Sequence, residues 1–427
     1  MDKAPAPLSP RIWFVLTLLA ITGQIAWAVE NSWFNTFVYD MLTPDPRAVA
    51  RMVGVSAVTA TLTTLFMGTL SDRTRSRWGR RKPYILFGYI LWGNSTIVVP
   101  TVAYIKVTSI AVIGVVLADA VMTFFGSTAN DAAFNAWTAD VASTHTRGRV
   151  EGVLNVSVFI AQIVALVAAG ILIDEAGYFV FFYLLGGIVI LSGVIAGGLL
   201  QDPPLPPEPE GGRPSYWKEI TGLFNVDTLR NNRVLFILFL NIMIVSIAFN
   251  VGFPYLIIYV ENYLGFTKSE FSIIGGAVVL GSALLAFPAG LLADRWDRRR
   301  MIIVMTVIGS LGAFLFSLAT GIAAVTLTAF IWQAFTMATT VASGAWLKDL
   351  LPEENRGKFL GVRMIFWIAI PMVIGPAIGS WLIQNYGIPT TSNGEAGFIP
   401  VPVLFQVTAV IALLSLIPLI FIKKKTS

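Results

Sequence analysis

The stretch "GTLSDRTRSRWGRRKPYI" occupies residues 68–85 and carries an unusual density of charge. Apolar sequence flanks it on both sides, over 53–70 and 84–104. Each flank approaches or reaches the length of about 20 residues that crosses the hydrocarbon of a bilayer. We therefore interpret the stretch as a short loop between two membrane-spanning helices. Its charged residues are Asp72, Arg73, Arg75, Arg77, Arg80, Arg81 and Lys82.

The composition of the whole chain supports a membrane protein. Of its 427 residues, 56% are hydrophobic and 12% are charged, whereas soluble domains carry about 25% charged residues. There is no cysteine, and His145 is the only histidine, which excludes disulfides, thiol catalysis and His/Cys metal clusters. No nucleophile–base arrangement typical of a membrane enzyme is visible, and no room remains for a soluble sensor domain. We predict no enzymatic activity, no cofactor and no metal site.

Twelve apolar segments can be read along the chain. Glycine and proline are frequent inside them, as membrane helices tolerate. The sequence therefore predicts an all-α membrane protein with twelve spans. The expected spans are 12–39, 50–71, 84–104, 110–138, 148–173, 178–200, 233–260, 270–293, 301–320, 322–347, 358–385 and 402–422.

The lysines and arginines are distributed unevenly between the two sides of these spans. With the N-terminus inside, 24 lie in inner loops and tails, 4 lie in outer loops, and Arg363 lies within a helix. The positive-inside rule then places both termini in the cytoplasm of a multi-pass cell-membrane protein. The net charge of +5 serves this anchoring, so we expect a lipid bilayer and no nucleic acid as partner. The start, "MDKAPAPLSPR", does not resemble a cleaved signal peptide.

Three segments of the first half recur in the same order in the second half. The recurrence predicts two homologous halves of six helices each, which is the architecture of secondary transporters with a site between the halves. The pairs are separated by 222, 209 and 220 residues: "GTLSDRTRSRWGRRK" (68–82) with "GLLADRWDRRRM" (290–301), "WTADVASTHTRGRVEG" (137–152) with "WLKDLLPEENRGKFLG" (346–361), and "WFNTFVY" (33–39) with "FPYLIIY" (253–259).

Between the halves lies a polar, proline-rich segment. It cannot span a membrane and is typical of a semi-rigid connector. We predict an N-terminal bundle over 1–200, a cytoplasmic linker over 201–232 and a C-terminal bundle over 233–427. Trp217, Ile220, Leu223 and Phe224 share one face, which predicts a short helix on the inner membrane surface.

The charged loop resembles the signature between helices 2 and 3 of the major facilitator superfamily. Gly68 and Asp72 precede Gly79 and paired basic residues, in the longer spacing found in the sucrose–proton symporter branch and in relatives of the glycoside–pentoside–hexuronide symporters. The segment "AWAVENSWFNTFVYD" (26–40) is similar to the first helix of that group. The resemblance implies the major facilitator fold and transport of a sugar or glycoside by alternating access.

A gating role is predicted for the aspartates that recur at the inner face. A helix N-terminus carries partial positive charge, and an anion beside it gains about 0.3–1 kcal/mol. Asp72 would face the N-terminus of helix 11, and Asp294 that of helix 5, only when the inner side is closed. The alternative is that Asp72 merely pairs with arginines at the surface. The candidate gating residues are Gly68, Asp72, Arg73, Gly79, Arg80, Arg81, Asp140, Arg147, Asp294, Arg295, Asp349 and Arg356.

Polar residues inside the spans are the candidates for binding and coupling, because ionisable groups there are costly and usually functional. Asp131, Glu30 and Asp119 are the candidate proton-coupling carboxylates. Amides and aromatic rings suit sugar hydroxyls and sugar rings, although asparagines in spans often only join neighbouring helices. The candidate substrate-binding residues are Gln24, Trp27, Asn31, Asn35, Asn130, Asn135, Asn155, Gln162, Asn250, Tyr255, Trp332, Gln333 and Trp367.

The preferred function is proton-coupled symport of a sugar or glycoside, with no need for oligomerisation. A proton requires one desolvated carboxylate, whereas sodium requires several oxygen ligands. Helix 2, "VGVSAVTATLTTLFMG", contains no acid, unlike melibiose-type relatives. A sodium-coupled sugar symporter and a proton-coupled exporter of drugs or metabolites remain the alternatives. Helix 5 lacks the proline–glycine pattern of exporters.

Overall fold

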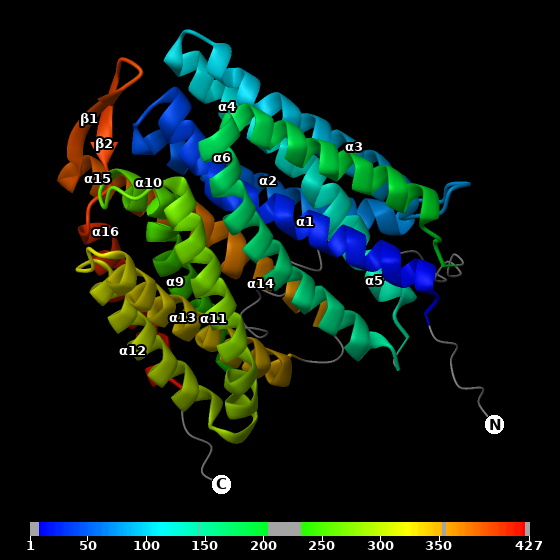
Figure 1. Cartoon of the computed structure of the whole chain (residues 1–427). Coiled ribbons are helices and arrows are strands. Elements are labelled where there is room, and N and C mark those ends of the chain that lie inside the picture. Colours follow the sequence, from blue (N-terminus) through cyan, green and yellow to red (C-terminus); the bar gives the residue numbers. More distant parts are fainter. Residues whose placement is uncertain (1–7, 144, 204–231, 352–355, 423–427) are drawn as a thin grey trace. The chain divides into compact units, whose positions relative to one another are not determined.

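The computed structural model describes residues 8–143, 145–203, 232–351 and 356–422. Contacts divide the chain into two compact units, and Figure 1 shows both as sets of long helices. The first unit holds the chain up to Leu42 and from Val58 through the sixth span. The second holds the C-terminal half together with Thr43–Ala57. Most of the predicted linker, including its expected surface helix, lies outside the described residues.

The first unit is built around one long helical segment against which α1 and α3 both pack. Helix α2 begins in the second unit and ends in the first. Spans 1 and 4 each change from an α-helix to a π-helix along their length, and span 3 changes to a 3₁₀-helix. The elements are α1 (Pro10–Phe37), η1 (Val38–Leu42), α2 (Pro46–Arg73), α3 (Lys82–Val98), η2 (Val99–Tyr104), α4 (Thr108–Gly126), η3 (Ser127–Phe134), α5 (Asn135–Val141) and α6 (Arg147–Leu199).

In the second unit α13 packs against α11 and α12, while α9 packs against α15 and α16. A buried cluster of apolar side chains, including Phe239, Met301 and Phe359, fills the space between these helices. The elements are α9 (Arg233–Gly252), η4 (Phe253–Tyr255), α10 (Leu256–Asn262), α11 (Lys268–Arg295), α12 (Arg298–Phe316), α13 (Ile322–Leu350), α14 (Arg356–Met364), η6 (Ile365–Ala369), α15 (Ile370–Tyr386), β1 (Ile388–Ser392), β2 (Glu395–Ile399), α16 (Val403–Leu414) and α17 (Leu416–Ile420).

The described part of the chain contains 11 helical segments apolar and long enough to cross a membrane. One of them, Arg147–Leu199, has 53 residues, about 80 Å at 1.5 Å per residue, and is too long for one crossing. It breaks at Gly177, whose φ of 82° and ψ of 168° favour glycine. The break lies between the predicted spans 148–173 and 178–200, so this segment supplies two crossings and the prediction of twelve is confirmed.

A β-hairpin follows α15 and was absent from the sequence-based prediction. β1 and β2 pair antiparallel, and Asn393 and Gly394 turn the chain with φ values of 53° and 80°, as expected of a tight hairpin turn. The Phe398 amide donates to the Pro44 carbonyl at 3.1 Å. This contact helps to explain why Thr43–Ala57 groups with the second unit, although the sequence assigned it to the first bundle.

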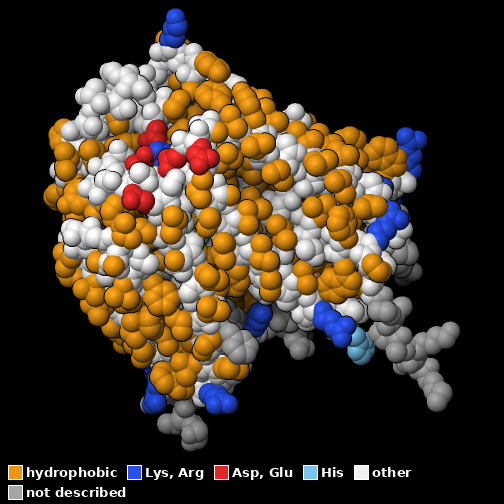
Figure 2. All heavy atoms as spheres, in the orientation of Figure 1, with side chains coloured by type: hydrophobic (Ala, Val, Ile, Leu, Met, Phe, Trp, Pro, Cys, Tyr) orange, Lys and Arg blue, Asp and Glu red, His pale blue; other side chains and the backbone are white. Residues whose placement is uncertain are grey.

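The outward-facing side chains of the helices are apolar. Leu284, Ile273 and Leu117 are 70%, 64% and 60% exposed, which water would disfavour and lipid accommodates. Figure 2 shows hydrophobic side chains over most of the visible face, with most lysines and arginines at its margins. This distribution agrees with spans that end in charged loops.

The orientation of these spans is a prediction that fusion reporters can check. We expect reporters at residues 45 and 393 to report the outside, because few cations lie in those loops. Reporters at 145, 210 and 298 should report the cytoplasm. An external signal from position 210 would contradict both the count of spans in the first half and the orientation.

Candidate functional site

The polar centre of the first unit lies where span 4 leaves the α-helical geometry. Between α4 and α5, residues 127–134 form a π-helical stretch. Such stretches are rare in helices and are frequent at functional sites. Asn130 and Asp131 both lie in this stretch, so its wider turn presents the polar residues that the sequence had singled out. Two more π-helical stretches, η1 and η6, lie in spans 1 and 11.

Asp131 takes its described contacts from neutral groups. Asn130 Nδ2 donates to Asp131 Oδ1 at 3.1 Å. The Tyr89 hydroxyl lies 3.0 Å from Asn130 Oδ1 and 3.1 Å from the Leu19 carbonyl. The network therefore holds a carboxylate inside a span without a described salt bridge.

Gly23 allows span 1 to approach this network. A Cβ atom at position 23 would lie 2.3 Å from Asn130 Oδ1 and 3.0 Å from the Tyr89 hydroxyl. Neither side chain can retreat freely, because Asn130 and Tyr89 are both buried. Any larger residue at position 23 would therefore separate α1 from η3 or break the hydrogen bonds that orient Asn130.

Two further carboxylates, Glu30 on α1 and Asp119 on α4, are buried in the same two spans. The Thr123 hydroxyl donates to Glu30 Oε1 at 2.9 Å. Asp119 lies one turn before Thr123 on α4 and is 2% exposed, while Glu30 is 7% exposed. The structure thus brings all three predicted coupling carboxylates to spans 1 and 4. Of the three, Asp131 is the least buried, with an intermediate exposure.

The predicted binding residues of the first unit differ in exposure. Gln24, Trp27, Asn31 and Gln162 are half-buried, Asn135 and Asn155 are exposed, and Asn35 is fully buried. Four asparagines donate their amide hydrogens to carbonyls one turn earlier, at 2.8–3.1 Å. These bonds occupy the donor and leave the amide oxygen for another partner. The four are Asn31, Asn35, Asn135 and Asn155.

In the second unit two of the predicted residues lie within packed structure. Tyr255 is 1% exposed, and its hydroxyl lies 3.1 Å from the Pro46 carbonyl and 3.0 Å from the Pro376 carbonyl. Trp332 is 6% exposed and packs against Phe316 and Phe405. These contacts are those of structural residues, so a binding role for either stays a prediction.

The remaining candidates of the second unit are more accessible. Asn250, Gln333 and Trp367 are half-buried. The Arg363 guanidinium lies 4.2 Å from the centre of the Trp367 ring, a cation–π geometry that stabilises a cation in a span. Trp367 belongs to the π-helical stretch η6. The second unit therefore holds a cation and an aromatic ring within a span, on the π-helical side of α15.

The charged loop folds around Arg81, which is 3% exposed. Its guanidinium binds Asp72, lies 3.2 Å from Asp140 Oδ2, and donates to the Ser71 hydroxyl at 2.5 Å. Arg80 also binds Asp140, at 2.7 Å. Asp72 therefore pairs with an arginine, as the alternative expected, but this arginine is buried and not at the surface. The gating role stays a prediction.

The other candidate gating residues lie in or beside the charged loop, at the start of α6 and in the second unit. Gly79 has a φ of 100°, and a Cβ there would lie 2.1 Å from Asp202, which accepts from the Arg81 and Lys82 amides at 2.8 and 3.1 Å. In the second unit Asp349 lies 3.5 Å from Arg298, which parallels the Asp140 pairs. Gly68 lies within α2. The side chains of Arg73, Arg147 and Arg295 are exposed. For Asp294 and Arg356 the structure describes only the backbone.

Several residues of the polar centre were not predicted as site residues. Tyr89 contacts Asn130, the neighbour of Asp131, and Thr123 contacts Glu30. Their only sequence signal is a hydroxyl within an apolar run, which many structural residues share. In the described part of the chain no cluster of three or more metal-ligating side chains occurs.

Comparison with known proteins now identifies the fold. The sequence profile described as Major Facilitator Superfamily matches residues 12–267 and 234–427. The chain belongs to the Major Facilitator Superfamily. It is therefore a multi-pass membrane transporter and not an enzyme.

Two solved structures of transporters are distantly similar in sequence to this chain. The nucleoside transporter NupG (D323A mutant) superimposes with a TM-score of 0.76 at 12% identity, over 96% of this chain and 99% of that chain. A bacterial homologue of the human lysosomal transporter Spinster gives 0.71 at 14% identity, over 98% and 96%. Likeness at this identity concerns the fold alone.

Curated relatives match the chain over shorter regions. The quinolone resistance protein NorA of Staphylococcus aureus is 22% identical over 169 residues, 39% of this chain and 43% of NorA. An uncharacterized MFS-type transporter of Methanocaldococcus jannaschii is 25% identical over 140 residues, 32% of this chain and 36% of that protein. The chain therefore spans less than half the length of these relatives.

Proposed function

We propose that this transporter couples the entry of a proton to the uptake of a sugar or glycoside by alternating access. The observation that carries the proposal is Asp131, a carboxylate in a span whose described hydrogen bond comes from the neutral Asn130 amide. A lone carboxylate of this kind can gain and lose a proton without breaking an ion pair. The π-helical stretch η3 holds it at a half-buried position beside polar side chains.

The neighbouring side chains favour an uncharged, hydroxyl-rich substrate. Their amide oxygens can accept from hydroxyl groups, and Trp27, half-buried and 5.1 Å from Trp92 between ring centres, offers a ring for stacking. Sodium coupling has less support, because sodium requires several oxygen ligands and span 2 contains hydroxyl groups but no acid.

Export of amphiphilic compounds is the second candidate function. The match to NorA, a quinolone resistance protein, favours it, as do the aromatic side chains at the polar centre and beside Arg363. A single thermal-shift experiment separates the two candidates. The purified protein is heated at two pH values with mono- and disaccharides or with a lipophilic cation such as tetraphenylphosphonium.

A ligand at 100 times its Kd stabilises the folded state by about 2.7 kcal/mol. Uptake of sugars predicts stabilisation by at least one saccharide that changes with pH. Stabilisation by the lipophilic cation alone would instead support export and contradict the preferred proposal. Repeating the titration with sodium and potassium salts tests sodium coupling, which predicts a saccharide response that requires sodium.

We also predict that Asp72→Asn shifts the resting transporter toward the inward-open state. The substitution keeps the size of the side chain but removes the charge proposed to face the helix 11 terminus. A loss of about 1 kcal/mol changes the ratio of states about fivefold. Spin labels on introduced cysteines measure this, because the chain has no native cysteine. The distance between positions 145 and 300 should lengthen, and that between 106 and 262 should shorten.

Asp140→Asn is the matched control for this gating prediction. It removes a charge from the same arginine cluster but leaves Asp72 in place. If both variants give wild-type distances, Asp72 serves only to pair with Arg81. If both shift equally, the loop acts through its fold and not through the aspartate that faces helix 11.

A further inference from the structure

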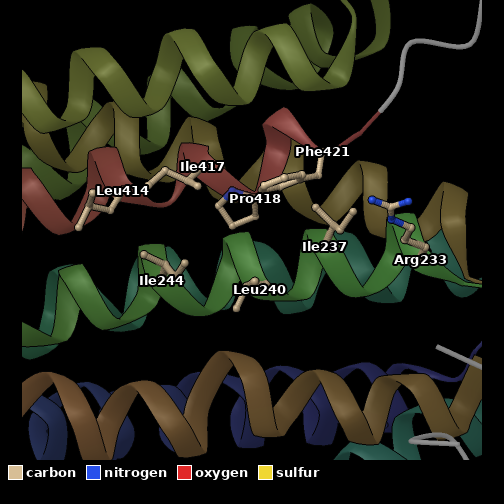
Figure 3. A pocket seen from close by; sticks show the side chains of 8 residues that line it. All are labelled: Arg233, Ile237, Leu240, Ile244, Leu414, Ile417, Pro418 and Phe421. Atoms are coloured by element: carbon tan, nitrogen blue, oxygen red, sulfur yellow. The ribbon is translucent and has the colours of Figure 1, made fainter. Parts of the chain in front are cut away.

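A groove of about 430 Å³ lies on the second unit between α9 and the α16–α17 helices (Figure 3). Seven of its eight lining residues are apolar, and the eighth, Arg233, lies toward one end. Figure 3 shows Arg233 beyond Ile237 and on the same end as Phe421. The lining residues are Arg233, Ile237, Leu240, Ile244, Leu414, Ile417, Pro418 and Phe421.

The groove has the length of one leaflet of a bilayer. Its α9 wall consists of residues spaced by four, three and four positions, from Arg233 to Ile244, which form one stripe along a helix. Eleven residues at 1.5 Å each span about 16 Å, and half of the ~30 Å hydrocarbon core is about 15 Å. A single acyl chain lying along α9 would therefore cover the stripe.

The opposite wall is shaped by a fixed interruption of the last span. Pro418 cannot donate a backbone hydrogen bond, and α16 ends at Leu414 while α17 begins at Leu416. Asn241, fully buried, donates its amide to the Ser415 carbonyl at 2.7 Å. Because this bond satisfies a carbonyl at the interruption, the groove is a stable feature of the second unit.

The Arg233 end of the groove is positively charged. Arg233 is the first residue of α9 and is exposed, and no described acidic side chain forms a salt bridge with it. Arg299 Nη1 donates to the carbonyl of Ile422, the residue after Phe421, at 3.0 Å. Two guanidinium groups thus lie near the boundary of the membrane, where the apolar groove ends.

We propose that this groove binds an anionic phospholipid, with one acyl chain along α9 and the headgroup beside Arg233. An apolar channel with a cationic end complements an amphiphile with an anionic end. Zwitterionic phosphatidylcholine fits less well, because its ammonium group lies beside the phosphate and is repelled by arginine. The proposal is independent of the substrate and of the coupling ion.

Native mass spectrometry of the full-length protein tests this site with equal amounts of phosphatidylglycerol and phosphatidylcholine. A basic residue near a membrane surface changes the binding of an anionic lipid about fivefold. We expect wild type to retain phosphatidylglycerol preferentially and Arg233→Gln to lose about fivefold of that preference. The matched control is Arg149→Gln, which removes an exposed arginine from the first unit and should keep the preference.

A second variant tests the apolar part of the groove. Leu240→Trp fills the channel and should reduce retention of both lipids while leaving the thermal transition of the protein unchanged, since Leu240 is 39% exposed. Equal retention of the two lipids by wild type would overturn the proposal. So would a preference that survives Arg233→Gln, or retention that survives Leu240→Trp.

Discussion

Asp131→Asn should abolish accumulation of substrate against its gradient while leaving exchange of substrate across the membrane. Asparagine keeps the size of the side chain and one oxygen that can accept a hydrogen bond, so the contact with Asn130 can re-form. It cannot take up a proton, and net transport driven by a pH gradient then stops. Exchange requires no net movement of protons and therefore persists. The measurement is uptake into proteoliposomes with and without an imposed pH gradient, beside counterflow in the same vesicles.

Asp45→Asn serves as the control, because it removes a half-buried carboxylate that pairs with the exposed Arg47. It should retain uphill uptake. If Asp131→Asn still concentrates substrate when the pH gradient is imposed, Asp131 is not the coupling residue. Glu30→Gln and Asp119→Asn would then be measured in the same way, because these carboxylates are buried on the same two spans.

Arg81→Met should cause the largest loss of stability among substitutions in the charged loop. Removing one partner of a buried ion pair costs about 3–5 kcal/mol. Because the Asp72 side chain is 43% exposed and water can solvate it, we expect about 2–3 kcal/mol. At about 2–4 °C per kcal/mol for a domain of this size, the thermal transition of the purified protein should fall by about 4–12 °C.

Arg81→Lys and Arg73→Met separate the causes of this loss. Lysine keeps the charge but cannot bind Asp72, Asp140 and Ser71 with one planar group, so its transition should fall by an intermediate amount. Arg73 is exposed, and its loss should change the transition little. Equal effects of Arg73→Met and Arg81→Met would show that the loop responds to total charge and not to the buried arginine.

The sequence alone determined the spans and their pairing into two repeats. Hydropathy is a property of each residue and its near neighbours, so an apolar run of sufficient length predicts a helix in the bilayer without knowledge of its contacts. The break at Gly177 lies between two predicted spans for the same reason. The hairpin at 388–399 also had a local signal in Asn393–Gly394, a dipeptide that favours a tight turn.

Only the tertiary structure decided which polar side chains meet. Arg81 binds Asp72 nine positions away and Asp140 fifty-nine positions away, and Glu30 binds Thr123 across ninety-three. The π-helical stretch at Asp131 and the burial of Tyr255 likewise depend on neighbouring helices. A carboxylate or hydroxyl in an apolar run indicates that the side chain needs a polar partner, because an unpaired polar group in a membrane is costly. Which partner it finds depends on distances between spans, and those distances are set by the packing of the whole bundle.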